Sequence, residues 1–486
     1  MRRALKVAAF GTLIGGAGLY YSFPLLRDDW KHLLYAGIRI FRITKTASVI
    51  AVNYIGGITP EKHRENAARL YKTLLSNGGC YVKFGQAIAQ LDLLVPQEYA
   101  DAMKPMLNEC QIEDFEIIKQ TLEEELKQAI SEVFIEFEKK PIASASLAQV
   151  HKAKLKNGSI VAVKVQHQHI REEMPGDIRV LDFLARTGKK LYSDFDYEWL
   201  IDDLKVNTAQ ELNFNIEISN ALRCANIFKG DPYIKVPKMY TDFSTDKVVT
   251  MEFIDGVLVT NISGIQKMGL DFKDIAHTLS RAFNEMIFVH GFVHCDPHPG
   301  NILIRPSKVR GKAEVVLLDH GLYKELPINV KNSYSGMWKS IILKDEDGMK
   351  KHAAELGVTS MYPLLAGMMV GRPWEEIMSN AEGFEKFRNA RAYASDKEAL
   401  RSHALRWNRE INQILGLINR DLVLLFKTFE WLRAIDAELG APINTIQIIA
   451  DYCTRNNTSL WARWWIQFKM WIFVRVMIWM GWVGLL

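Results

Sequence analysis

One segment near the middle of this 486-residue chain, GFVHCDPHPGNILI at residues 291–304, carries side chains that suit phosphoryl transfer. Asp296 is followed five positions later by Asn301, which opens a short apolar strand, and a second apolar strand ends at Asp319. Phosphoryl transfer requires a carboxylate that orients the attacking hydroxyl or water, and oxygen ligands that hold Mg²⁺ across the phosphates. The spacing therefore predicts Asp296 as the catalytic carboxylate and Asn301 and Asp319 as the Mg²⁺ ligands.

A lysine that could anchor nucleotide phosphates lies 132 residues upstream of Asp296, in the sequence VAVKV. This residue, Lys164, lies on a predicted strand and completes a set of four residues in the order that kinases use. It needs an acidic partner on a helix, and the segment QELNFNIEISN supplies Glu211 and Glu217. We predict an ion pair between Lys164 and Glu217; the alternative is that these acids lie on a solvated helix face.

The segment where such enzymes carry a glycine-rich phosphate loop contains alanine and serine but no glycine. Glycines let the backbone amides of a loop close around phosphates, whereas alanine and serine restrict positive φ angles and stiffen the loop. A nucleotide can still bind, but ATP hydrolysis or small-molecule phosphorylation is favoured over phosphorylation of a protein. The residues predicted to cover the nucleotide are Ile142, Ala143, Ser144, Ala145, Ser146, Leu147, Ala148, Gln149 and Val150.

The residues around the predicted catalytic carboxylate differ from those of protein kinases. The sequence from residue 294 reads HCDPH where protein kinases have His-Arg-Asp, and no Ala-Pro-Glu follows Asp319. The usual peptide-docking segment is therefore missing, and the loop resembles that of small-molecule phosphotransferases. Three nearby histidines are predicted to be structural residues rather than a dedicated metal site: His294, His298 and His320.

Periodicity predicts the helices that carry these residues. Residues 28–130 follow a helical pattern, in which Thr59 is a suitable N-cap and Pro60 a suitable first helical residue. Further helices are predicted over 197–227 and 271–290 and through most of the chain beyond residue 330.

Alternation of apolar and other residues predicts strands between these helices. Residues 150–165 read as a β-hairpin that turns at Asn157-Gly158. After the turn, Val161, Val163 and Val165 point to one face and Lys164 points to the other. Two strand-like pieces, YIKVPKMY and DKVVTMEFI, end at Asp255-Gly256, which marks a break between a mixed lobe and the following part. The apolar pieces NILI and EVVLL then predict the two strands that carry the magnesium ligands.

Composition narrows the class of protein. The net charge is +5, but residues 1–50 hold eight Lys or Arg against two acids, so the remaining chain is nearly neutral. A basic surface for nucleic acid is therefore not expected. The five cysteines are far apart and form no Cys-x-x-Cys pair, which argues against a disulfide framework or zinc module and favours a reducing compartment.

Both ends of the chain have features of membrane association. Residues 1–27 begin with three basic residues and continue with an uncharged stretch about long enough to cross a bilayer. This start favours a mitochondrial targeting or membrane-anchoring segment over the alternative, a secretory signal. Residues 456–486 contain six tryptophans with interspersed Lys and Arg, which predicts a membrane-associated helix; a helix packed on the body of the protein is the alternative.

Four motifs stand in the order found in one known family. They are Lys83-Phe84-Gly85-Gln86, the alanine-rich loop Ala143-Ser144-Ala145-Ser146, Glu211 in a Glu-x-Asp region, and the HCDPHPGN block that ends at Asn301. On these motifs, the chain resembles the UbiB or aarF-domain family of atypical kinases over about residues 60–440. The resemblance implies an α+β, protein-kinase-like fold with two lobes, an extra N-terminal helical extension and a predominantly α-helical C-lobe.

The resemblance also assigns roles to residues outside the kinase core. It implies that Lys83 and Gln86 reach into the site from the N-terminal extension and that Glu211 belongs to the same network. The family's Glu-x-Asp reads Glu211-Leu212-Asn213 here, so the acceptor oxygen of the aspartate is kept and its charge is lost.

These observations predict five parts of the chain. They are a targeting or anchoring segment (1–27), a helical extension (28–130), a kinase-like N-lobe (131–255), a kinase-like C-lobe (256–455) and a tryptophan-rich membrane-associated helix (456–486).

The predicted function is that of an atypical kinase or ATPase that uses ATP or ADP with Mg²⁺. By resemblance, it acts at the mitochondrial inner membrane in the homeostasis of coenzyme Q, other isoprenoids or membrane lipids. The expected partners are adenine nucleotide, a membrane lipid or small lipophilic molecule, and mitochondrial proteins, with no nucleic acid. Two alternatives stay open: a true protein kinase, and a pseudokinase scaffold that nucleotide binding gates without turnover.

Overall fold

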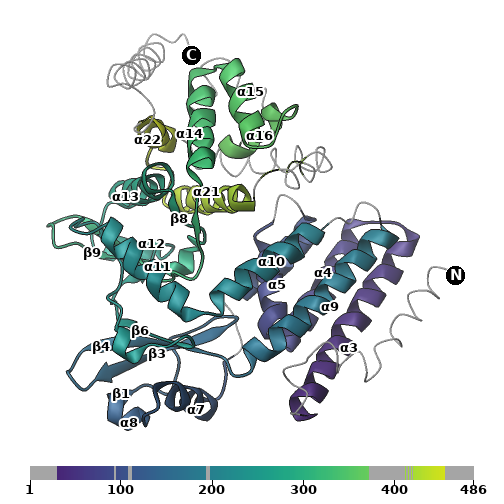
Figure 1. Cartoon of the computed structure of the whole chain (residues 1–486), viewed down its shortest axis with the longest axis vertical. Helices are drawn as coiled ribbons and strands as arrows, with labels where there is room; N and C mark the ends of the chain where they lie inside the picture. Colours follow the sequence, from purple (N-terminus) through teal and green to yellow (C-terminus); the bar gives the residue numbers. More distant parts are fainter. Residues whose placement is uncertain are drawn as a thin grey trace. The chain divides into compact units, whose positions relative to one another are not determined.

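The computed structural model describes residues 30–91, 95–107, 112–192, 197–371, 411, 414, 418 and 420–454 (Figure 1). The predicted targeting segment and the predicted tryptophan-rich helix, 1–27 and 456–486, lie outside the described residues. The chain divides into two compact units. The first contains residues up to 219 together with 238–253, and the second contains 220–237 together with residues from 254 onwards.

Helices make up most of the first unit (Figure 1). They are α3 (Trp30–Asn53), α4 (Pro60–Asn77), α5 (Gly79–Ala89), α6 (Gln97–Met103), α9 (Ile170–Leu191) and α10 (Glu198–Glu211). Their apolar faces share one core, in which Leu74, Tyr81 and Met103 are fully buried. α4 begins as the sequence predicts, because the Thr59 hydroxyl accepts a hydrogen bond from the Lys62 backbone N–H and Pro60 is the first helical residue.

The first unit also contains an antiparallel sheet. Its strands are β1 (Phe134–Phe137), β2 (Ala143–Ser144), β3 (Ala148–Leu155), β4 (Ile160–Gln166) and β6 (Val248–Glu252), in the order β1-β3-β4-β6 with β2 paired to β3. The predicted hairpin is β3–β4, and Gly158 in its turn has φ +86°. The three valines of β4 are fully buried with Ile118 and Leu122 of α7 (Phe115–Leu126), beside the short α8 (Ile130–Val133). This packing leaves alternate β4 side chains, including Lys164, on the other face.

The described part of the second unit has two small sheets. One has the order β5-β10-β9-β7, with β5 (Ile234–Lys235), β7 (Val257–Leu258), β9 (Ile302–Pro306) and β10 (Ala313–Leu317). The other pairs β8 (Phe292–His294) with β11 (Tyr323–Glu325). The helices are α12 (Ile262–Lys267), α13 (Phe272–Asn284), α14 (Ile328–Leu343), α15 (Glu346–Glu355), α16 (Tyr362–Val370), α21 (Arg420–Glu438) and α22 (Thr445–Cys453). Short 3₁₀ turns lie at Tyr54–Gly56, Lys104–Leu107, Thr241–Phe243 and Pro299–Asn301.

Two predicted helices differ from continuous α-helices. The helix over 271–290 is α13 followed by a π-helical segment, Glu285–His290, which ends at Gly291 with φ +62°. The helix over 197–227 is interrupted at Leu212 and Asn213, and the chain resumes as α11 (Phe214–Ile227). Periodicity alone does not detect this interruption, because the apolar pattern continues through it and contacts with distant residues produce the break.

A buried ion network holds α3 against α9 in the first unit. Arg39 of α3 is only 1% exposed and pairs with Glu173 and Asp177 of α9. The rings of Tyr35 and Tyr81 lie 5.6 and 5.4 Å from the guanidinium carbon, so the cation also has aromatic neighbours. The network therefore ties the N-terminal extension to the helix that follows β4.

A second buried polar group lies in the second unit, among α13, α14, α21 and α22. A cavity of about 60 Å³ is lined there by mostly apolar side chains, and its charged lining residues are Arg433 and Asp436. Oδ1 of Asp436 makes no hydrogen bond within the described part of the chain, and burial raises the pKa of this carboxyl to about 7. Between pH 4 and 7 the folded state keeps a proton that the unfolded chain has lost, so stability falls as the pH rises through this range.

Replacing Arg39 by methionine should destabilise the first unit by about 3 to 5 kcal/mol, because two buried carboxylates lose their counter-charge. The midpoint of denaturant unfolding measures this change. The triple change Arg39→Met, Glu173→Gln and Asp177→Asn should recover much of the lost stability, because no unpaired charge then remains. A triple variant no more stable than Arg39→Met would show that the ion network is not what holds α3.

Replacing Asp436 by asparagine should stabilise the second unit by roughly 1 to 3 kcal/mol at pH 7.5 and flatten its stability between pH 4 and 7. Thermal unfolding across this pH range measures both effects. Asp347→Asn, at an almost fully exposed carboxylate on α15, is the matched control and should leave the pH dependence unchanged. If stability changes with pH equally in Asp436→Asn and in the unmodified protein, Asp436 is not the source of this pH dependence.

Candidate functional site

The first unit holds Lys164 in a fixed position on β4. Its Nζ lies 2.9 Å from both carboxylate oxygens of Glu217 on α11. Glu217 is buried, and the ring of Phe214 lies 5.2 Å from the ammonium group. A buried carboxylate requires such a partner, so each charge restrains the other. On the sheet, Lys164 is paired with Val150, the last residue of the alanine-rich loop.

The alanine-rich loop forms a β-hairpin that needs no glycine. Strand β2 pairs with the start of β3, and the backbone N–H of Ala145 donates to the Ala148 carbonyl at 2.8 Å. The turn is completed by Ser146 and Leu147, and no residue between 142 and 150 has a positive φ angle. The structure therefore accounts for the composition of the loop: its backbone follows conformations that alanine and serine adopt without strain.

Residues of α5 contact this hairpin and the end of α10. The Ser146 hydroxyl donates to Oε1 of Gln86 at 3.3 Å, while Nε2 of Gln86 donates to the Met106 carbonyl at 2.8 Å. One turn earlier on α5, Lys83 pairs with Glu211 at 2.5 Å. The structure thus brings Lys83, Gln86 and Glu211 of the family motifs into one region, with the loop as a direct contact of Gln86.

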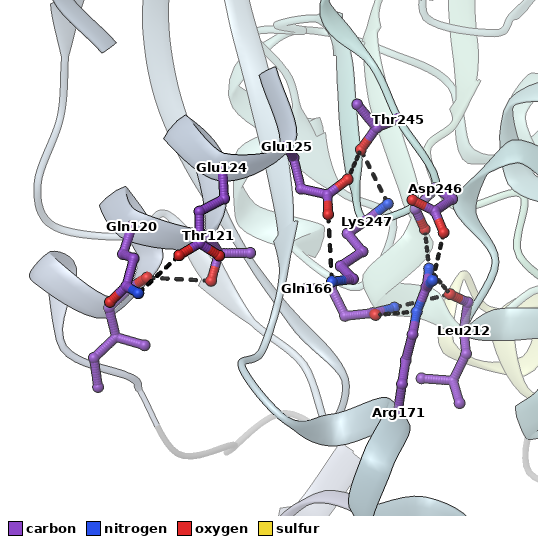
Figure 2. Close-up of polar contacts among 11 residues, drawn as sticks. Gln120, Thr121, Glu124, Glu125, Gln166, Arg171, Leu212, Thr245, Asp246 and Lys247 are labelled. Carbon is purple, nitrogen blue, oxygen red and sulfur yellow. Dashed lines mark hydrogen bonds and ion pairs between the residues drawn. The ribbon is translucent and has the colours of Figure 1, made fainter. Parts of the chain in front are cut away.

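Glu211 and Glu217 serve different lysines because the chain breaks between them. Figure 2 shows that the side chains of Gln166 and Arg171 converge on the Leu212 carbonyl, at 3.0 and 2.6 Å. Arg171 also pairs with Asp246, and its Nε donates to Oε1 of Gln166 at 2.7 Å (Figure 2). Carbonyls at a helix C-terminus lack intrahelical partners, and these two side chains satisfy the one at the end of α10.

Asn213, which replaces the family's aspartate, begins the next helix. Its Oδ1 accepts a hydrogen bond from the Asn215 backbone N–H at 3.1 Å, and α11 starts at Phe214. This is the position and contact of a helix N-cap, where asparagine and aspartate are equally suitable. The replacement therefore keeps the local structural role that an acceptor oxygen provides.

Three residues near the loop were not identified as candidates from the sequence. His167 follows β4, with Nδ1 3.3 Å from Oε2 of Glu113 and Nε2 3.2 Å from the Ala145 carbonyl. His151 on β3 is fully buried, with Nε2 2.9 Å from Nε2 of Gln149. Glu113 lies 54 residues before His167, so no local spacing could have revealed this contact.

In the second unit, the residues predicted to bind Mg²⁺ lie at the same end of one hairpin. The Leu318 backbone N–H donates to the Asn301 carbonyl at 2.9 Å, which places Asn301 beside the residue preceding Asp319. One carboxylate oxygen of Asp319 accepts the Gly321 backbone N–H at 2.8 Å. An amide oxygen and a carboxylate at neighbouring positions are the kind of donors that Mg²⁺ prefers when it is bound with phosphates. These residues therefore fit the ion.

The three histidines of this region make structural contacts. Nδ1 of His294 accepts the Asp296 backbone N–H at 3.1 Å, and burial lowers the pKa of His294 to about 3, so its ring is neutral. His320 is buried with its Nδ1 2.9 Å from the Tyr323 hydroxyl, and Nδ1 of His298 accepts the Gly300 N–H at 3.1 Å. Among the described residues, no group of three or more His, Cys, Asp or Glu side chains is arranged to hold a metal.

A helix that crosses a bilayer must be long and apolar along its length, and this requirement applies to each described helix. Within the described residues, none is both long enough and apolar enough to span a membrane.

Comparison with known proteins agrees with the motifs and the fold. A model of the ABC1 atypical kinase-like domain matches residues 105–353. AarF domain-containing protein kinase 1 of Mus musculus is 33% identical over 96% of this chain and 92% of its own length. AarF domain-containing kinase 1 of Drosophila melanogaster is 35% identical over 94% of this chain and 90% of its own length.

A solved structure shares the fold. The structure of the Rv3197–erythromycin complex from Mycobacterium tuberculosis aligns with a TM-score of 0.51 over 81% of this chain and 96% of that chain, at 20% identity. The predicted α+β, kinase-like fold with preceding N-terminal helices is thereby confirmed. Because the domain match spans half of the sequence and the relatives match nearly all of it, the chain belongs to the ABC1/AarF family of atypical kinase-like proteins.

Proposed function

We propose that this protein is an atypical kinase or ATPase that binds ATP or ADP with Mg²⁺. The observation that carries the proposal is the ion pair of Lys164 with Glu217, in which both carboxylate oxygens lie 2.9 Å from Nζ. Kinases use a lysine held in this way to contact the α- and β-phosphates of the nucleotide.

The remaining roles follow from the chemistry of the side chains. Asp296 would orient the attacking hydroxyl or water, and Asn301 and Asp319 would hold Mg²⁺. The ion, when bound, neutralises charge on the phosphates. Residues 142–150 would cover the nucleotide beside Lys164. Gln86 would restrain that loop from the N-terminal extension, and Lys83, paired with Glu211 of α10, would belong to the same network.

Hydrolysis or phosphorylation of a small molecule is favoured over protein phosphorylation. The loop is a short hairpin restrained by Gln86 through Ser146, and its backbone lacks the freedom that glycines provide. The motif that anchors a peptide substrate after Asp319 is also missing from the sequence. The restrained loop and the missing peptide-anchoring motif both disfavour binding of a protein substrate. They support a smaller molecule as the phosphate acceptor.

We further propose that the protein acts at the mitochondrial inner membrane on lipid or isoprenoid homeostasis, including that of coenzyme Q. The basic start of the sequence and the family resemblance support this location. One face of α3 adds support, because Leu34, Ile38, Phe41 and Val52 are 41–65% exposed while Ala36, Ile40 and Ile43 of the opposite face are buried. The helix contains no acidic residue, and exposed Arg42 and Lys45 accompany the apolar face. Apolar and basic side chains together favour an anionic lipid surface.

Changes at Lys164 and Asp296 should separate nucleotide binding from turnover. Lys164→Met should weaken Mg²⁺–ATP and Mg²⁺–ADP binding, measured as loss of nucleotide-dependent thermal stabilisation. Asp296→Asn should keep this stabilisation but lower phosphate release by about 10²- to 10⁴-fold, because only the orienting carboxylate is lost.

Lys154→Met is the matched control for Lys164→Met, because Lys154 lies on the neighbouring strand β3 and should not contact the nucleotide. Nucleotide binding by the unmodified protein without phosphate release, in the presence of lipid, would favour the gated scaffold instead. Absence of any nucleotide-dependent stabilisation would contradict both the enzyme and the scaffold.

The apolar face of α3 should enter a lipid surface when the full chain binds vesicles of mitochondrial inner-membrane lipid. A nitrobenzoxadiazole probe on Phe41→Cys should shift its emission to shorter wavelength, because the side chain moves from water into the acyl boundary. The same probe on Ile160→Cys, at a comparably exposed isoleucine of β4, is the control and should not shift. An unshifted spectrum at position 41 on vesicle-bound protein would exclude α3 from the membrane contact.

A further inference from the structure

His167 links three separate parts of the first unit around the nucleotide loop. It follows β4, three residues after Lys164. Its Nδ1 lies 3.3 Å from Oε2 of Glu113, in the segment before α7, and its Nε2 lies 3.2 Å from the Ala145 carbonyl, at the hairpin turn. The His167 backbone N–H donates to the Leu147 carbonyl at 2.9 Å, which fixes the position of the ring beside the loop.

Both ring nitrogens of His167 face groups that can only accept hydrogen bonds. A carbonyl oxygen has no proton to donate, and neither does an ionised carboxylate. A neutral imidazole carries one N–H, so it can satisfy one of these two contacts and would turn a lone pair towards the other oxygen. Only the imidazolium form, with an N–H on each nitrogen, makes both hydrogen bonds at once.

His151, on the adjacent strand, provides an internal comparison. Oε1 of Gln149 accepts the Glu113 backbone N–H at 2.9 Å, so the amide nitrogen of Gln149 faces Nε2 of His151 and donates to it. Nδ1 of His151 then donates to the Glu138 carbonyl at 2.8 Å. One donor and one acceptor suit a neutral ring, and burial lowers the pKa of His151 in agreement. The two histidines beside the loop therefore have opposite requirements for charge.

Five ion pairs hold other charged groups on the elements around His167, and Asp114, beside Glu113, accepts the Glu116 backbone N–H. Glu113 also accepts the Gln168 backbone N–H at 3.3 Å through the oxygen that faces His167, which holds the carboxylate in place. The ion pairs on these elements are Lys83 with Glu211, Lys164 with Glu217, Arg171 with Asp246, Glu173 with Arg39, and Lys247 with Glu125. Glu113 is thus the charged side chain that His167 contacts.

We propose that His167 is a positioning residue which, in its protonated form, clamps the alanine-rich loop to Glu113 and so makes loop order and nucleotide affinity depend on pH. The loop is held in place when His167 is charged, and one of the two hydrogen bonds is lost when the ring becomes neutral. A loop that is already ordered loses less conformational freedom when nucleotide binds, so the clamped form has the higher affinity. The pH dependence of nucleotide affinity, unlike that of loop order, rests on the proposed nucleotide site.

Hydrogen–deuterium exchange of the full chain tests the clamp without any nucleotide. Protection of the peptide spanning residues 142–150, corrected for intrinsic exchange, should be lower at pH 8 than at pH 6, because a ring that has lost one N–H makes only one of its two hydrogen bonds. His167→Gln should be poorly protected at both pH values. His167→Arg keeps a permanent cation with several N–H donors and should be protected at both. His277→Gln, at an exposed histidine of α13, should behave as the unmodified protein.

Nucleotide affinity tests the consequence of the clamp. The Kd for Mg²⁺–ADP should rise by about three- to tenfold from pH 6 to pH 8 in the unmodified protein, relative to the change in His167→Arg. If protection falls equally in the unmodified protein and in both His167 variants, His167 is not the clamp. If protection responds as expected but the Kd ratio does not, the coupling to nucleotide binding is wrong. Because exchange is measured without nucleotide, failure of the clamp remains distinguishable from failure of the proposed function.

Discussion

The interruption between α10 and α11 is the constraint on which the arrangement of the first unit depends. Gln166 and Arg171 supply hydrogen-bond donors to the Leu212 carbonyl, and Asn213 supplies an acceptor to the first turn of α11. With both new helix ends satisfied, the chain can change direction between Glu211 and Glu217. On one continuous helix, residues six positions apart point to different sides in a fixed relation. Both lysines would then have to lie where that one helix directs the two acids. The break allows each acid to follow its own helix and meet its own lysine.

The two ion pairs that result connect the N-terminal extension and the sheet to one pair of helices. Lys83 reaches Glu211 from α5, while Lys164 reaches Glu217 from β4. The alanine-rich loop lies beside both, because it pairs with β3 and contacts Gln86 one turn from Lys83. A loop restrained at so many points gains little from glycine. The alanine and serine of the loop therefore suit a backbone that uses no positive φ angle and that Gln86 contacts through Ser146.

In the second unit, short backbone contacts rather than long-range ion pairs position the predicted site residues. The β9–β10 hairpin brings Asn301 next to the residue before Asp319, and His294 accepts the backbone N–H of Asp296. His294 can act in this way because burial keeps its ring neutral and leaves Nδ1 as an acceptor. His294 therefore helps to hold the loop on which the predicted catalytic carboxylate lies, while His320 contacts Tyr323 and the Leu317 carbonyl.

The sequence by itself determined the local elements and the residue types of the candidate site. Contacts within a few residues specify these elements. Thr59-Pro60 specifies a helix start, Asn157-Gly158 specifies a turn, and the alternating valines of β4 specify a buried face. The motifs likewise named Lys164, Asp296, Asn301 and Asp319 and the family. Only the tertiary structure decided the interruption at Leu212, the placement of Arg39 between two acids, and the meeting of His167 with Glu113 and the Ala145 carbonyl. Each of these joins residues tens to more than a hundred positions apart, and no periodicity or spacing in one sequence encodes which distant polar groups will satisfy each other once they leave water.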